Sequence, residues 1–145
     1  MTQERNKIFA AVYLILLRDK KVAMIRRYNT GYQDGNFTLP SGHIDAGESA
    51  IAATLREAKE ETGVDVQPET LNLAHLIHRN STDRVYADFY FVTESWDGEP
   101  VNNEPEKADR LEWFDLNDLP QNIIPDVKTA IELFSKGDNY SEFGW

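Results

Sequence analysis

Residues 42–64 read GHIDAGESAIAATLREAKEETGV, and they predict the helix around which the rest of the chain is arranged. Ser49 is a favoured residue at a helix N-cap, and Gly63 is a favoured residue just past a helix end. The residues between them are rich in Ala, Leu, Glu, Lys and Arg, which are good helix formers. At about 100° per residue, an apolar stripe forms that predicts the buried face. The stripe consists of Ile51, Leu55, Ala58 and Thr62.

Three glutamates crowd the last two turns of this helix: Glu57, Glu60 and Glu61. Glu57 and Glu61 share an edge about 100° from the apolar stripe, and a like-charge pair at this spacing destabilises a helix by about 0.2–0.5 kcal/mol. The helix dipole also disfavours anions near the C-terminus. The glutamates therefore form either a solvated face or a site for a divalent cation, which would reverse both penalties. Oxygen ligands without His or Cys suit Mg²⁺, Mn²⁺ or Ca²⁺ rather than zinc.

The same stretch resembles the Nudix box, Gly-x5-Glu-x7-Arg-Glu-U-x-Glu-Glu-x-Gly-U with U aliphatic, at every glycine and polar position. A chance match at so many specified positions occurs on the order of once in 10⁸ windows. Ala58 stands where the family usually has Ile, Leu or Val, a departure that concerns packing rather than chemistry. Weaker similarity to the MutT-like branch extends over most of the remaining chain. The matching residues are Gly42, Glu48, Arg56, Glu57, Glu60, Glu61 and Gly63.

The composition is that of a soluble globular protein, and 145 residues predict a single domain, residues 1–145. A net charge of −10 argues against nucleic-acid and anionic-membrane partners, which need basic surfaces. It does not exclude small phosphorylated substrates, because a bound metal supplies positive charge locally. The absence of cysteine excludes disulfides, thiolate catalysis and cysteine–zinc sites. No signal or membrane-spanning segment is recognised, so we expect a cytoplasmic monomer or homodimer.

Strand patterns alternate with two helical patterns along the chain. The second helix is expected to begin at Pro125, followed by an apolar stripe at i, i+3, i+4 and i+7 from Val127. A 14-residue acidic loop spans 94–107, and loops of this length are usually functional. The order predicts an α/β fold with a mixed sheet between two helices, and the resemblance implies an α/β/α sandwich. Strands are expected at residues 8–17, 22–27, 71–77, 83–93 and 110–115.

The resemblance implies a metal site made by Glu57 and Glu61, with Glu60 next and with the backbone carbonyl of Ser41 as an added ligand. Carboxylates within two turns are close enough to share one or two hard cations, and Mg²⁺, with Mn²⁺ as the alternative, bridges protein carboxylates to substrate phosphates. Such metals would polarise the phosphorus and hold the attacking water.

The resemblance also assigns catalytic roles outside this ligand set. Glu48 and Arg56 look like the family's orienting pair, which holds the loop against the helix by a charge-assisted bond. MutT-like enzymes place a glutamate base in the loop before the penultimate strand, and the spacing in residues 96–104 indicates Glu104. Glu106 is the alternative in the same loop, and Glu60 is the alternative within the box.

Three further residues are expected at the substrate. His43 follows the first glycine of the box, where it can contact a phosphate. Arg26 and Arg27 end the second strand, and strand alternation points them to opposite faces, so we expect at most one, taken as Arg26, to meet the substrate. Asn122 lies near the last helix, where the resemblance implies recognition of the nucleotide base.

The expected reaction is Mg²⁺-dependent hydrolysis of a nucleoside triphosphate to a nucleoside monophosphate and pyrophosphate. This choice is made by elimination, since residues 76–84 lack the proline typical of the ADP-ribose group and the coenzyme A and NADH signatures are absent. ADP-ribose, dinucleoside polyphosphates and other diphosphates remain alternative substrates. A non-catalytic nucleotide-binding Nudix module is the alternative from another class, but such modules often lose box residues.

Overall fold

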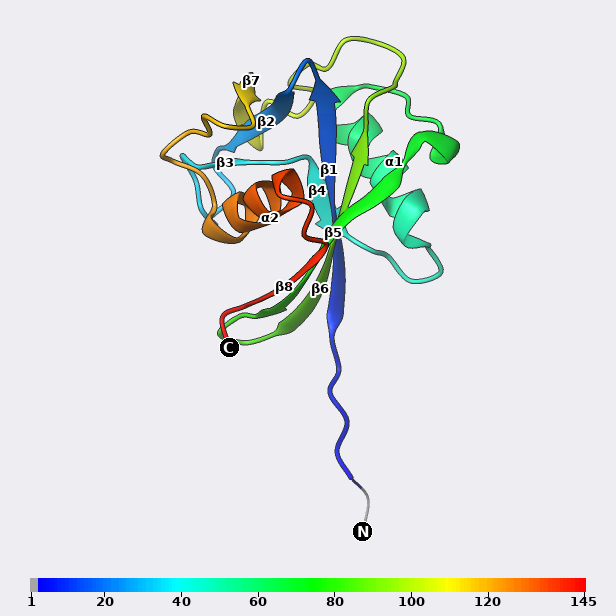
Figure 1. Cartoon of the computed structure of the whole chain (residues 1–145), viewed down its shortest axis with the longest axis vertical. Coiled ribbons are helices and arrows are strands. Elements are labelled where there is room, and N and C mark those ends of the chain that lie inside the picture. The colour runs from blue at the N-terminus through cyan, green and yellow to red at the C-terminus, as the bar shows by residue number, and fades with distance from the viewer. Residues whose placement is uncertain (1–2) are drawn as a thin grey trace.

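The chain folds as a mixed sheet with one helix on each side, in a computed structural model that describes residues 3–145 (Figure 1). This is the α/β/α arrangement expected from the sequence. The strands are β1 (Phe9–Arg18), β2 (Lys21–Arg27), β3 (Phe37–Thr38), β4 (Ser41–His43), β5 (Asn72–Asn80), β6 (Val85–Thr93), β7 (Ala108–Asp115) and β8 (Tyr140–Phe143). The helices are α1 (Ala50–Thr62) and α2 (Pro125–Ser135), with a short 3₁₀ helix at Pro68–Thr70.

Strand β1 is the centre of the sheet, whose order is β3-β2-β1-β6-β5-β8, with β4 added to β1 and β7 added to β2. β1 runs parallel to β6 and antiparallel to β4, so that Val12 lies between Phe89 and Gly42. Because alternate side chains of a strand point to opposite faces, the apolar run of β1 supplies both sides of the sheet. Ile15 packs in the core under α2, whereas Val12 and Leu14 pack in the core under α1.

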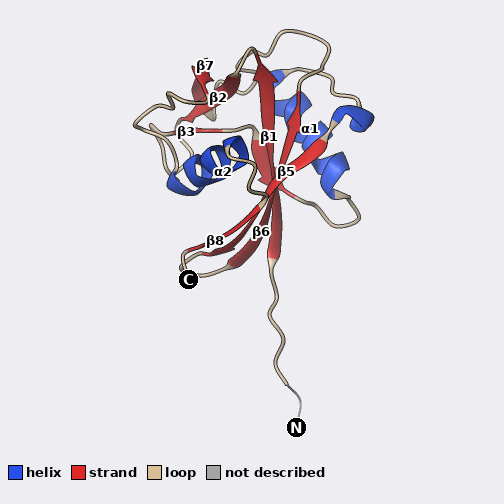
Figure 2. Cartoon of the chain, viewed as in Figure 1, coloured by secondary structure: helices blue, strands red, loops and turns tan. Residues whose placement is uncertain are grey.

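The two helices lie on opposite faces of this sheet, as Figure 2 shows. α2 begins at Pro125. Its first two turns contain the buried residues Val127, Ala130 and Ile131, as the apolar stripe predicts. α1 begins after Ser49, whose side chain accepts a hydrogen bond from the Ala52 amide, and it ends where Gly63 adopts a left-handed φ of 78°. Both predicted helix ends of α1 are therefore confirmed.

The buried face of α1 differs from the predicted stripe. Ile51 is 39% exposed and Leu55 is only half-buried, so the prediction was wrong for Ile51. β4 packs on the side of α1 that carries Glu57 and Glu61. The buried face of the helix therefore lies closer to these glutamates than the apolar stripe predicts. The two glutamates therefore face the protein rather than open solvent. The fully buried residues of α1 are Ala53, Thr54, Ala58 and Thr62.

The C-terminal residues form an edge strand that the sequence did not predict. β8 runs parallel to β5, with Tyr140 opposite Leu76. The indole of Trp145 donates a hydrogen bond to the carbonyl oxygen of His78, 2.9 Å away, which gives His78 a structural contact at the end of β5. Within residues 3–145, no helix is both long enough and apolar enough to cross a membrane.

Candidate active site

The box strand and the box helix meet at two backbone positions. The amide of Ser41 donates a hydrogen bond to Oε2 of Glu61 at 2.9 Å. At Gly42, a Cβ atom would overlap the carboxylate of Glu57, so a larger residue there would displace this carboxylate from its place against β4. The spacing of the first box glycine from the glutamates thus has a direct steric reason, since the backbone of β4 lies against both carboxylates.

Glu57 and Glu61 form a largely buried carboxyl pair. The side chain of Glu57 is 12% exposed, and burial raises its pKa. Burial, followed by the charge of Glu57, raises the pKa of Glu61 well above its usual value. The two carboxyl groups lie within hydrogen-bonding reach of each other. Such a pair keeps both charges only when positive charge is supplied from outside it, and Arg56 supplies such charge to Glu57 alone, so a proton or a cation at Glu61 would complete the neutralisation.

Arg56 joins the loop that follows β4 to the helix. Its Nε and Nη2 atoms donate to the two carboxylate oxygens of Glu48 at 2.8 and 3.0 Å, and Nη2 also donates to the carbonyl oxygen of His43. The hydrogen bonds from Arg56 lower the pKa of Glu48 to about 2. Nη1 of Arg56 donates to Oε1 of Glu57 at 2.7 Å, so one guanidinium holds the loop and the edge of the carboxyl pair together.

Glu60 lies outside the pair. Its side chain is 49% exposed, and its nearest cationic atom is Nη1 of Arg56 at 3.4 Å. Within the described part of the chain, no three His, Cys, Asp or Glu side chains converge closely enough to hold a metal by themselves. The donor chemistry nevertheless fits Mg²⁺, which uses one or two protein carboxylates and takes its other ligands from water and substrate phosphates. Glu57 and Glu61 are the two carboxylates placed for this role.

The acidic loop brings Glu104 to the same place. Glu104 and Glu61 line one small cavity of about 60 Å³, together with Arg27, Thr30 and Lys107. The charge of Glu104 is among the causes that raise the pKa of Glu61, in keeping with this proximity. Glu106 is exposed and does not line the cavity. Of the two loop glutamates considered for the base, the structure places Glu104 beside the box glutamates, on the same side as Glu61.

The two arginines at the end of β2 have different surroundings. Arg26 donates two hydrogen bonds to the carboxylate of Asp109, at 2.8 and 2.7 Å, on the surface. Arg27 lines the cavity that contains Glu61, and it is held there by hydrogen bonds to the carbonyl oxygen of Tyr32 and the hydroxyl of Thr30. Strand alternation separates the two as expected, and the one beside the carboxyl pair is Arg27 rather than Arg26.

His43 and Asn122 lie on the α2 side of the site. Nε2 of His43 lies 3.3 Å from the hydroxyl of Tyr86, and the two rings stack with centroids 5.7 Å apart. The side-chain amide of Asn122 donates to the carbonyl oxygen of Gly35 at 2.9 Å. The side chain of Asn122 thus supports the loop between β2 and β3, and the acidic side chain from the start of α2 that reaches β5 is Asp126.

Asp126 belongs to a buried charged cluster that sequence reasoning missed. Nε of Arg79 lies 2.6 Å from the carboxylate of Asp88 and 3.4 Å from that of Asp126. The Arg79 guanidinium lies over the ring of Tyr86, 4.1 Å from its centroid. Burial raises the pKa of both aspartates. The only signal in the sequence was the polar character of alternate residues in 83–93, because the three charged groups come from β5, β6 and α2.

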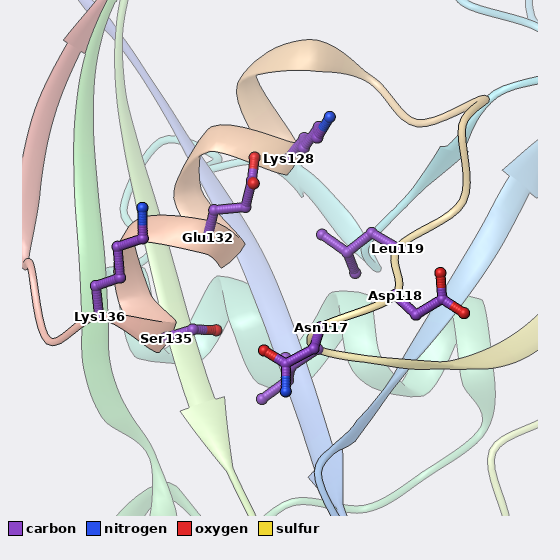
Figure 3. A pocket seen from close by; sticks show the side chains of 8 residues that line it. Asn117, Asp118, Leu119, Lys128, Glu132, Ser135 and Lys136 are labelled. Atoms are coloured by element: carbon purple, nitrogen blue, oxygen red, sulfur yellow. The ribbon is translucent and has the colours of Figure 1, made fainter.

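A larger cavity, of about 420 Å³, lies elsewhere, between residues 116–119 and the outer side of α2 (Figure 3). Lys128, Glu132 and Lys136 line it from the helix, and none of the box residues reaches it. The chemical groups of the box therefore define the candidate site, although the cavity beside them is the smaller one.

Comparison with known proteins agrees with this geometry. The family described as NUDIX domain matches residues 7–134, so the chain belongs to the Nudix family. It is a MutT-like Nudix hydrolase, an enzyme class that acts on nucleoside diphosphate derivatives.

Individual relatives carry related names. The chain is 27% identical over 126 residues to an 8-oxo-dGTP diphosphatase of Escherichia coli (strain K12), covering 87% of this chain and 94% of that protein. It is 32% identical over 111 residues to an ADP-ribose pyrophosphatase of Methanocaldococcus jannaschii, covering 77% of this chain and 64% of that protein. The crystal structure of a MutT NUDIX hydrolase from Burkholderia pseudomallei superposes with a TM-score of 0.80 at 25% identity, covering 88% of this chain and 98% of that one.

Proposed function

We propose that this chain is a Mg²⁺-dependent pyrophosphohydrolase that cleaves a nucleoside triphosphate to a nucleoside monophosphate and pyrophosphate. Water attacks a phosphorus atom, the anhydride bond breaks, and the proton of the water passes to a carboxylate. The observation that carries the proposal is the buried pair of Glu57 and Glu61, which lies against Ser41 and Gly42 and shares a cavity with Glu104. The name of the E. coli relative, a diphosphatase of a nucleoside triphosphate, supports this substrate class.

The metal would be held by Glu57 and Glu61, with the Ser41 carbonyl as an added ligand and Glu60 as the next carboxylate. When bound, Mg²⁺ or Mn²⁺ neutralises phosphate charge and polarises the phosphorus toward attack. Arg56 fixes the positions of Glu57 and the loop, so the carboxyl pair is oriented before substrate binds. Arg27 also lines this cavity, where its guanidinium can bind phosphate oxygens.

Glu104 is the proposed general base. Its carboxylate is 24% exposed and lines the cavity beside Glu61, where it can accept the proton of the attacking water. Nζ of Lys107 lies 3.9 Å from this carboxylate. Glu60, exposed and turned toward Arg56, is the alternative base.

The nucleoside would lie along the α2 side of the sheet. Tyr86 and His43 present stacked rings there, and the Arg79–Asp126 pair supplies hydrogen-bonding groups behind them. Aromatic faces with a few fixed polar groups are the usual lining of a small-molecule site. We further propose that the partners are small nucleotides alone, and that the protein is a cytoplasmic monomer or homodimer.

The test is product release over a panel of nucleotides with and without Mg²⁺. Nucleoside triphosphates, including oxidised purine forms, should yield pyrophosphate, and exhaustive EDTA treatment should abolish turnover. ADP-ribose belongs in the panel because the M. jannaschii relative is named for it. Turnover that survives EDTA would exclude the metal site. Tight nucleotide binding without turnover on any substrate would instead indicate a binding module.

A further inference from the structure

The C-terminus of α1 is capped by the acidic loop. A helix leaves its last four carbonyl groups without partners inside the helix. Here the side-chain amide of Asn103 donates to the carbonyl oxygens of Lys59 and Glu60 at 3.3 and 3.2 Å. The backbone amide of Asn103 donates to the carbonyl oxygen of Glu61 at 3.0 Å. One residue of the loop therefore satisfies the carbonyl groups of three consecutive residues, among them the two adjacent glutamates of the box.

These bonds determine where the next residue lies. Glu104 follows Asn103 directly, and its own amide donates to the side chain of Asn102 at 3.3 Å. The carbonyl oxygen of Glu104 accepts from the amides of Lys107 and Ala108 at 2.9 and 3.0 Å. Glu104 is thus held on one side by the end of α1 and on the other by the turn into β7. The long loop is anchored at the point where it approaches the carboxyl pair, although its length and composition predict mobility.

We propose that Asn103 is a positioning residue, which holds the Glu104 carboxylate beside Glu61 before substrate binds. The inference rests on the proposed role of Glu104 as the base. Asn103 itself is exposed and contacts only backbone carbonyl groups, so its effect on the reaction passes through Glu104. If the cap served stability alone, its removal would lower the melting temperature and leave the chemical step unchanged.

The experiment is a double-mutant cycle between positions 103 and 104. Asn103→Ala removes the side-chain amide and its two hydrogen bonds but keeps the backbone amide, and we expect kcat to fall about ten- to a hundredfold with little change in KM, since misplacement by about 1 Å has effects of this size. In the Glu104→Gln background the same change should have almost no effect on kcat, because the group that it positions no longer accepts a proton. Asn103→Asp, close to isosteric, should resemble Asn103→Ala, since a carboxylate cannot donate to carbonyl groups.

Ser49→Ala is the matched control, because it removes the side-chain cap at the other end of the same helix. It should lower the melting temperature and leave kcat unchanged. The inference is overturned when Asn103→Ala leaves kcat unchanged, or when its full effect persists in the Glu104→Gln background. An absence of turnover in the unmodified enzyme would instead refute the proposed function, so the two failures are distinguishable.

Hydrogen exchange of the unmodified protein gives a check that needs no variant. The amides of Val101 and Asn103 donate to the carbonyl oxygens of Thr62 and Glu61, so they should be protected to the same degree as the last turn of α1. Exchange of both amides at the rate of an open loop would show that the anchor does not persist in solution, and would overturn the inference.

Discussion

Two buried carboxyl pairs in this molecule are neutralised in different ways. On the α2 side of the sheet, Arg79 is shared by Asp88 and Asp126, and its side chain is 12% exposed. On the α1 side, Arg56 donates to Glu48 and Glu57 and lies 3.4 Å from Glu60, while Glu61 receives a hydrogen bond from the Ser41 amide. One arginine serves two carboxylates in the first cluster and four in the second, where Asp45 also lies 3.5 Å from Arg56.

The difference indicates where this protein needs a cation from outside. The Arg79 cluster supplies its own counter-charge from neighbouring strands, so its natural role is to stabilise the fold and to present fixed polar groups. In the pair of Glu57 and Glu61, Arg56 donates to Glu57 but not to Glu61, and burial together with the charge of Glu57 raises the pKa of Glu61 well above its usual value. This carboxyl pair lies beside a cavity and its negative charge is not fully compensated by the chain. Such a site is suited to a divalent cation that also binds a phosphate.

Replacement of Glu61 should have the largest effect on activity. Glu61→Gln removes the proposed metal ligand, and we expect kcat to fall about a thousandfold or more, since a catalytic metal contributes several kcal/mol. The metal-free variant should be no less stable than the unmodified protein at neutral pH, because a neutral amide replaces a carboxyl group whose pKa is raised by burial. Steady-state kinetics and thermal melts in EDTA measure both effects.

Glu69→Gln, on the exposed 3₁₀ helix, is the control for this change. It should leave both quantities unchanged. Near-normal turnover of Glu61→Gln would show that Glu61 is not a ligand.

Replacement of Arg79 should have the next largest effect, and on stability. Arg79→Met leaves two carboxylates buried without their cation, so the free energy of unfolding should fall by about 3–5 kcal/mol. Arg26→Met is the matched control, since it breaks the partly exposed pair with Asp109, where about 0–1 kcal/mol is expected. Urea denaturation measures both values. If the free energy of unfolding fell equally in the two variants, the Arg79 cluster would be no more important for stability than a surface ion pair.

Replacement of Glu104 tests which carboxylate receives the proton. Glu104→Gln keeps size and hydrogen-bonding reach, and kcat should fall about a hundredfold or more with little change in KM. Glu106→Gln, in the same loop but exposed, should have a mild effect. A reversal of the two effects would move the base to Glu106. If neither variant is impaired, Glu60 becomes the candidate.

The pH dependence should separate activity from stability. The pKa of Glu61 is raised, so the ionised form proposed to bind the metal is gained only as pH rises through that value, and activity should increase toward alkaline pH. The pKa of Glu48 is lowered from 4.5 to about 2, so its contribution to stability is full above 4.5 and is lost as pH falls toward 2. Activity should therefore disappear at a higher pH than the fold. A rate maximum below about pH 6 would contradict this order.

Much of the candidate site could be read from residue spacing. The resemblance of the box joined Glu48 to Arg56, and this contact is present. The loop position of Glu104 also agrees with the cavity that it lines. These features are predictable because each depends on neighbours in sequence or on a motif whose residues interact.

The features that could not be read depend on distant segments. Alternation separated Arg26 from Arg27 but could not tell which one faces Glu61, because Asp109 and the loop after β2 decide their partners. The pairing of Arg79 with Asp126 likewise needed the packing of α2 on β5. In the sequence, Asn103 has no feature that distinguishes it within the acidic loop. Its role depends on the hydrogen bonds that it makes with the end of α1.

Local properties such as hydrophobic period, capping residues and ligand type predict the two helices, the central apolar strand, the box and the chemistry of its carboxylates. The inward orientation of Glu57 and Glu61, the exposure of Ile51 and the C-terminal edge strand depend on packing between distant segments. Burial and strand pairing are set by whichever segment packs alongside. For α1 that segment is β4, whose glycine lets the backbone approach and gives the two carboxyl groups their environment.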